Sequence, residues 1–146
     1  MYGTAATGGA GPCFGGCGFA FKVSGSSFYT LHNFTGDDGA NPRSELLQAS
    51  DGNFYGTTVN GGNSNCQDGC GTIFRISPNG DFTSLYKFCS QSNCADGANP
   101  YSALVQGSDG NLYGTTSAVG ASPAATALSA VVRPARMTTL EVRSLA

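Results

Sequence analysis

Six cysteines are the side chains with the clearest chemistry in this 146-residue chain. They form three close pairs in loops rich in glycine or serine: Cys13 and Cys17, Cys66 and Cys70, and Cys89 and Cys94. An even set of closely spaced cysteines predicts local disulfides, each worth about 2 kcal/mol by the loop-entropy relation. A zinc site built from the first two pairs is the alternative, because such spacings are typical of zinc ligands. We prefer disulfides, since those two pairs fall in adjacent repeats, and disulfides indicate an oxidising compartment.

Aspartates recur in turn sequences. Asp51 and Asp109 each open Asp-Gly-Asn, whereas Asp38 and Asp96 each open Asp-Gly-Ala-Asn. Oxygen-rich loops can hold calcium, but this spacing is not that of the twelve-residue calcium loop. Asp and Asn side chains cap tight turns without a metal, so these sequences predict turns, and neither a metal nor a cofactor is expected.

Histidine and tyrosine are the remaining candidates for chemistry. His32 is the only histidine and aligns with Tyr86 in a predicted strand, without a serine or cysteine partner in a recognisable motif. No catalytic residue is therefore predicted. Tyr55 and Tyr113 could line a carbohydrate-binding funnel, but packing between repeats is the preferred interpretation for both rings.

An internal repeat positions all of these side chains. Sixteen of the 21 residues at 38–58 recur 58 positions later, and residues 2–24 match 55–77 at a shift of 53, so the chain opens in mid-repeat. The insertion at 89–94 lengthens one loop. The repeat motif consists of Asp51, Gly52, Asn53, Tyr55, Gly56, Thr57 and Thr58 in one copy and Asp109, Gly110, Asn111, Tyr113, Gly114, Thr115 and Thr116 in the other.

Each full unit predicts four short strands, at 44–49, 54–59, 71–77 and 82–88, because aromatic and β-branched residues lie between turn signals. Residues 41–48 could also begin a helix, with Asn41 as cap and Pro42 at the first position. The second copy favours a strand, since its equivalent segment is short and ends in glycine.

The predicted fold class is all-β, with tandem four-stranded antiparallel repeats of the size of β-propeller blades. About two blades make an incomplete propeller over 1–116, with units at about 38–95 and 96–116. Apolar faces would then stay open to self-association. The Ala-rich tail at 117–146 departs from the repeat, and we expect it to be disordered or weakly helical, in keeping with a frame change or a truncated gene.

Composition excludes several classes of protein. Seven basic residues stand against nine acidic ones without a basic cluster, so nucleic acid is not an expected partner. No apolar run reaches the length of a membrane span, and the first residues lack the features of a signal peptide.

The Tyr-Gly-Thr-Thr strands, each preceded by Asp-Gly-Asn, resemble the GloVer tandem-repeat family of bacterial surface and secreted proteins over residues 1–116. More distantly, these strands look like the blades of two-component-regulator and kelch-type propellers. The resemblance implies long extracellular arrays with varied anchoring ends, an extracellular or cell-surface location for the parent protein, and no catalytic residues to carry over.

We therefore expect a non-enzymatic repeat module for binding or display, as a fragment of a longer repeat protein whose ligand, a glycan or a protein, is unknown. Two alternatives stay open. The chain could be a fragment of a propeller lyase or hydrolase, or a truncated gene product without independent function.

Overall fold

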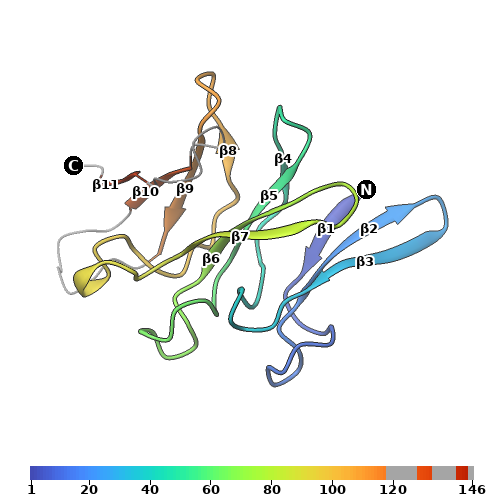
Figure 1. The fold of residues 1–146 in the computed structure, drawn as a ribbon, viewed down its shortest axis with the longest axis horizontal. Coiled ribbons are helices and arrows are strands. Elements are labelled where there is room, and N and C mark those ends of the chain that lie inside the picture. Colours follow the sequence, from blue (N-terminus) through green and yellow to red (C-terminus); the bar gives the residue numbers. More distant parts are fainter. Residues whose placement is uncertain (118–127, 133–140, 145–146) are drawn as a thin grey trace.

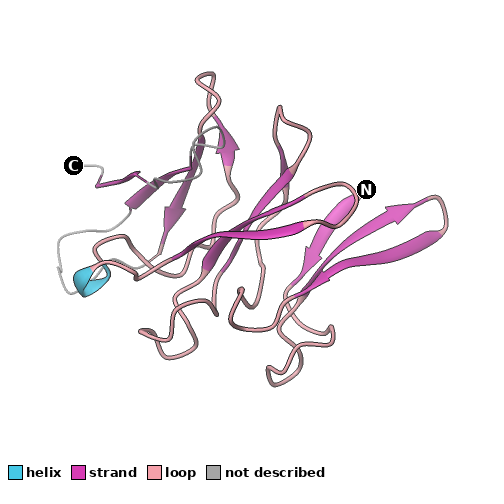
Figure 2. Ribbon diagram, in the orientation of Figure 1, coloured by secondary structure: helices cyan, strands magenta, loops and turns pink. Residues whose placement is uncertain are grey.

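The computed structural model describes residues 1–117, 128–132 and 141–144. These residues form three antiparallel sheets that lie side by side, from the blue N-terminal sheet to the brown and red C-terminal one (Figure 1). Loops join the strands, and a single short 3-10 turn, η1 (Ser92–Cys94), is present in the described part of the chain (Figure 2). No helix in this part has the length and apolar character needed to cross a membrane.

The sheets contain three, four and four strands. The N-terminal sheet has the order β1 (Tyr2–Ala5), β2 (Phe19–Ser24), β3 (Ser27–Asn33). The middle sheet has the order β4 (Leu47–Gln48), β5 (Phe54–Thr58), β6 (Thr72–Ile76), β7 (Phe82–Lys87). The C-terminal sheet has the order β8 (Val105–Gln106), β9 (Leu112–Thr116), β10 (Leu128–Val132), β11 (Glu141–Ser144).

The strand pairing repeats along with the sequence. Tyr2 faces Lys22 in the N-terminal sheet, and Tyr55 faces Arg75 in the middle sheet, both pairs shifted by the same 53 positions. A β-bulge interrupts β2 and β3 after Ala20, and another interrupts β6 and β7 at the equivalent position. The N-terminal sheet thus reproduces the last three strands of the middle sheet.

Three of the four predicted strands match closely, since β5, β6 and β7 lie within 54–59, 71–77 and 82–88. The first strand is shorter than predicted. Ser44 uses its Oγ atom in a 2.9 Å hydrogen bond with Thr57 Oγ1, and its carbonyl accepts a hydrogen bond from Thr4, so side chains tie this segment down before β4 begins. The helical alternative does not occur at 41–48.

The expectation of a disordered or weakly helical tail is wrong for two segments. Residues 128–132 and 141–144 form β10 and β11 and extend the sheet from β9, with Leu128 opposite Thr116 and Val132 opposite Leu112. A free strand edge offers a row of unpaired N–H and C=O groups, and this template outweighs the weak helical preference of a short isolated segment. The rest of the predicted tail after Ser117 lies outside the described residues.

Two cores fill the spaces between the sheets. The first core, between the N-terminal and middle sheets, contains Cys17, Ala20, Phe34, Ala40, Phe54, Phe74 and Ile76. The second core, between the middle and C-terminal sheets, contains Ala49, Tyr55, Cys70, Ile73, Phe88, Cys89, Ala98, Leu104 and Leu112. Successive side chains of β5 and β6 alternate between the cores, as the two-residue period of a strand requires, so the middle sheet is covered on both faces.

Candidate functional site

The Asp-Gly-Asn sequences form the same clamp in both copies. Asp51 accepts hydrogen bonds from the backbone N–H and the Nδ2 atom of Asn53, both at 3.0 Å, and from the Tyr55 hydroxyl at 2.7 Å. Asp109 accepts the equivalent bonds from Asn111 and Tyr113, the last at 2.6 Å. Each carboxylate therefore has the partners that a turn requires, as predicted for these residues.

In the first copy of this clamp, the aspartate pKa is lowered and the tyrosine pKa is raised. Burial alone would raise the pKa of Asp51, but hydrogen bonds from Asn53 and Tyr55 outweigh it and hold the pKa below its ordinary value. Burial, followed by the hydrogen bond to Asp51, raises the pKa of Tyr55 to about 12. Tyr55 is a buried packing residue of the second core, so the alternative of a funnel lining fails at this position.

In β1 and β5 the glycine of the Tyr-Gly-Thr sequence leaves room for a ring on the neighbouring strand. A Cβ atom at Gly56 would lie 2.6 Å from Phe74 Cζ, and one at Gly3 would lie 2.8 Å from Phe21 Cζ. Both distances are well inside van der Waals contact. The second threonine that follows Gly56 links neighbouring strands, since Thr58 of β5 and Thr72 of β6 share a hydrogen bond of 2.8 Å.

A second clamp involves the Asp-Gly-Ala-Asn turns. Asp96 is buried and accepts hydrogen bonds from the Tyr86 hydroxyl at 2.5 Å and from the backbone N–H groups of Ser90 and Gln91. Burial acts to raise the pKa of Asp96, but these hydrogen bonds outweigh it and the pKa lies below its ordinary value. Burial and the bond to Asp96 raise the pKa of Tyr86 to about 12.

His32 has the same position in the first copy as Tyr86 has in the second. Its Nε2 atom lies 2.8 Å from Asp38 Oδ2, and its ring stacks on Phe82 of the middle sheet at 3.6 Å. His32 therefore has a repeated structural role, as the equivalent of Tyr86 in this clamp. Sequence alignment pairs His32 with Tyr86 and Asp38 with Asp96, and this was the available signal for the shared clamp.

The three predicted disulfides are confirmed. Cys13 is bonded to Cys17, Cys66 to Cys70, and Cys89 to Cys94, and no cysteine is free. The alternative zinc set is divided, because its first pair belongs to the first core and its second pair to the second core. The structure instead brings the inserted third pair next to Cys66, a proximity that the spacing of the cysteines did not reveal.

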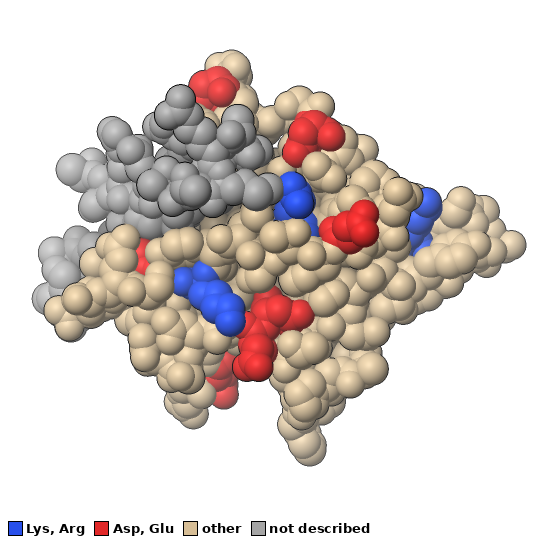
Figure 3. Space-filling view, viewed as in Figure 1, with Lys and Arg blue, Asp and Glu red and all other residues tan. Residues whose placement is uncertain are grey.

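A polar hollow of about 400 Å³ opens at the seam between β1 and the segment before β4. Sequence reasoning missed it. Its lining includes Tyr2, Arg43 and Glu45, and at the last two positions the second copy has Tyr101 and Ala103. The departure of these two positions from the repeat was the sequence signal that could have indicated the hollow. On the face drawn in Figure 3, acidic and basic side chains are sparse and scattered over a mostly uncharged surface.

Comparison with known proteins agrees with the internal repeat. No curated protein matches the chain. The sequence model of the Gloeobacter/Verrucomicrobia repeat matches residues 1–141, a range that includes all three sheets except residues 142–144 of β11. The chain therefore belongs to the Gloeobacter/Verrucomicrobia repeat family.

Proposed function

We propose that this chain is a non-enzymatic, extracellular or cell-surface repeat module that works by stacking its sheets, as propeller blades do, against further sheets of the same repeat. The three disulfides are compatible with an oxidising location. The aspartate and tyrosine side chains of the repeat motif are engaged in turns and packing, which supports a scaffold role over acid–base catalysis.

A single observation carries this proposal: the outer face of the N-terminal sheet presents an aromatic cluster. Phe21 and Phe28 stack with ring centroids 5.1 Å apart, and Phe19 packs on both at 6.1 Å. Phe28 is 56% exposed. An apolar patch of this kind on a soluble protein is typical of an interaction surface.

The middle sheet indicates what covers such a face. Phe74 and Phe82 hold the repeat positions of Phe21 and Phe28, and they pack against Phe34, the residue directly after β3, at 5.1 and 5.7 Å. The partner of the open face is therefore another sheet of this repeat, and in a solution of the pure chain a second copy supplies it.

Sedimentation of the full chain over a range of concentrations tests the proposal. We expect association that Phe28→Ser weakens by about tenfold, as the loss of a buried aromatic contact predicts. Tyr29→Ser is the matched control, because Tyr29 is 52% exposed but follows Phe28 and so projects from the opposite face of β3. A chain that stays monomeric, or equal effects of the two variants, would contradict the proposal.

Binding of a small polar ligand such as a glycan is a second candidate function, and the hollow beside Tyr2 favours it. Its volume falls within the usual range of ligand sites, and it combines an aromatic ring with one cation and one carboxylate. Labelled chain applied to a glycan array tests this candidate. The double variant Arg43→Tyr with Glu45→Ala gives the hollow the residues of the second copy, and we expect it to bind any retained glycan at least about tenfold more weakly.

A further inference from the structure

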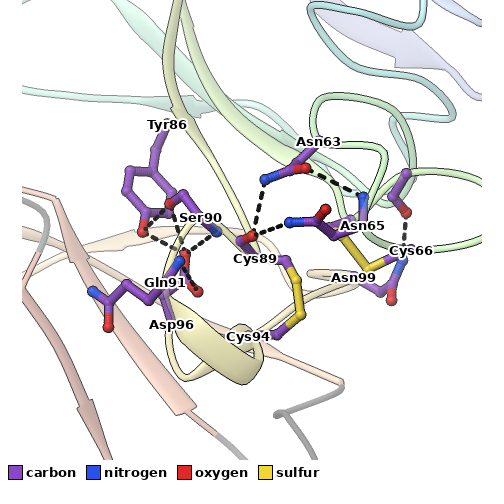
Figure 4. The surroundings of a disulfide bond; sticks show 12 residues. Asn63, Asn65, Cys66, Tyr86, Cys89, Ser90, Gln91, Cys94, Asp96 and Asn99 are labelled. Atoms are coloured by element: carbon purple, nitrogen blue, oxygen red, sulfur yellow. Dashed lines mark hydrogen bonds between the residues drawn. A yellow bond between two sulfur atoms is a disulfide. The ribbon is translucent and has the colours of Figure 1, made fainter.

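Two of the disulfides lie against each other. The Sγ atoms of Cys66, Cys89 and Cys94 are all within 4.8 Å of one another, although the residues come from two different loops. Cys70 is bonded to Cys66 and completes the set. Figure 4 shows the Cys89–Cys94 bond beside Cys66, with amide side chains around them. The four-cysteine cluster consists of Cys66, Cys70, Cys89 and Cys94.

The two loops are held together by hydrogen bonds that do not involve sulfur. Asn63 and Asn65 both donate from Nδ2 to the carbonyl of Cys89, at 2.9 and 3.0 Å (Figure 4). The backbone N–H of Asn99 donates to the carbonyl of Cys70 at 2.7 Å. Because these bonds depend on amides and carbonyls alone, cleavage of the disulfides does not remove the contacts that hold the backbone at Cys70 and Cys89.

We propose that the four-cysteine cluster, once reduced, is a tetrathiolate site for Zn²⁺. Zinc takes four thiolates in a tetrahedron with Zn–S distances of about 2.3 Å, which places the sulfurs roughly 3.8 Å apart. The Cys66 sulfur already lies within 4.8 Å of both sulfurs of the other disulfide, and Cys70 supplies the fourth thiolate once its bond to Cys66 is cleaved. Cys70 and Cys89 are buried and the other two half-buried, so the site is shielded from water on one side, as structural zinc sites are.

Reduction of both disulfides must precede zinc binding. Each disulfide takes two electrons and two protons from a dithiol reductant, which becomes a cyclic disulfide, and the two reductions give four thiols. Zinc binding then releases four protons and leaves four thiolates on the metal. The disulfide and zinc forms exclude each other, so the site exists only under reducing conditions and is independent of the sheet stacking proposed above.

The first copy of the repeat provides an internal control. The Cys13–Cys17 pair has the repeat position of Cys66 and Cys70, but the loop facing it carries no cysteine. A Cβ atom built on Gly36 would lie 3.9 Å from Cys13 Sγ, so a glycine of that loop stands beside the pair. Two sulfurs alone offer only half of a zinc ligand set.

Titration with Co²⁺ tests the site, since tetrahedral Co²⁺ thiolates absorb in the visible range and Zn²⁺ displaces the cobalt. The full chain is reduced with a phosphine, which takes up oxygen from water and becomes the phosphine oxide, under exclusion of air. We expect one Co²⁺ per chain with a tetrathiolate spectrum, both in the wild type and in Cys13→Ser with Cys17→Ser. Cys89→Ser with Cys94→Ser should bind about a hundredfold or more weakly.

Thermal unfolding of the same reduced samples separates loss of the site from loss of the fold. Zn²⁺ should raise the unfolding temperature of the reduced wild type and of the Cys13/Cys17 variant, and it should leave the Cys89/Cys94 variant unchanged. Binding of Co²⁺ with equal affinity by all three chains, or by the oxidised wild type, would overturn the proposal, as would a reduced wild type without a tetrathiolate spectrum.

Discussion

The middle sheet and the N-terminal sheet share three strands of the same sequence pattern, but they lie in different surroundings. All five residues of β5 are buried, whereas the four residues of its counterpart β1 are half-buried. The middle sheet has a neighbour on each face, and the N-terminal sheet has one on a single face. In such a stack the contribution of a residue to stability depends on its neighbours more than on its own repeat unit.

The largest difference between the two sheets is expected when equivalent phenylalanine rings are removed. Phe74→Ala should lower the free energy of unfolding by about 3 to 5 kcal/mol, because it empties a fully buried site in the first core. Phe21→Ala should cost about half as much or less, since Phe21 is only half-buried. Urea unfolding followed by circular dichroism measures both. Equal losses at low protein concentration would show that the N-terminal face is covered.

The aspartates of the second clamp allow a smaller test. Asp96→Asn should lower the free energy of unfolding by about 2 to 3 kcal/mol at neutral pH, because several donors lose a buried, charged acceptor. The low folded-state pKa of Asp96 stabilises the fold above the ordinary carboxyl pKa of about 4, and this stabilisation is lost as the pH falls through the folded-state value.

Acid titration of stability distinguishes this residue from its counterpart. The wild type should lose stability below about pH 4, and Asp96→Asn should lose less over the same interval. Asp38→Asn serves as control, because Asp38 is only half-buried whereas Asp96 is fully buried. An unchanged acid slope in Asp96→Asn would contradict the assignment.

Removing one disulfide from each copy of the repeat tests the two copies against each other. Each removal should lower the free energy of unfolding by about 2 kcal/mol, the value expected for loops of this length. The loss of stability should be larger for Cys66→Ser with Cys70→Ser than for Cys13→Ser with Cys17→Ser, because Cys70 and Cys89 pack together in the second core. Differential scanning calorimetry of both double variants measures the difference. A larger loss in the first copy would refute this ranking.

The smallest effect is expected from exchanging the two versions of the second clamp. His32→Tyr installs the residue of the second copy, and a tyrosine can both donate to Asp38 and stack on Phe82. The change in unfolding free energy should stay below about 1 kcal/mol, whereas His32→Ala should cost more. A large loss in His32→Tyr would show that the clamp requires an imidazole.

The repeat made most of the strands predictable, since each aromatic or β-branched run occurs twice between the same turns. The strands of the tail were not predictable from their own residues, because 128–132 pairs with an edge that only the folded β9 provides. The four-cysteine cluster was also hidden. Its formation depends on how the loop at 89–94 folds back on Cys66, and no spacing along the chain encodes that approach.

The shared β-bulge changes the face of the sheet to which the later side chains of the strand point. Phe82 and Phe88 are six residues apart, an even spacing that would place both rings on one face of a regular strand. Leu85 is the extra, unpaired residue between them, so Phe82 packs on the first core and Phe88 enters the second. Leu31 has the same place in β3. Deletion of this residue would move the side chains that follow it in the strand to the opposite face of the sheet. Evolution can therefore vary the residue types of this strand far more freely than its length.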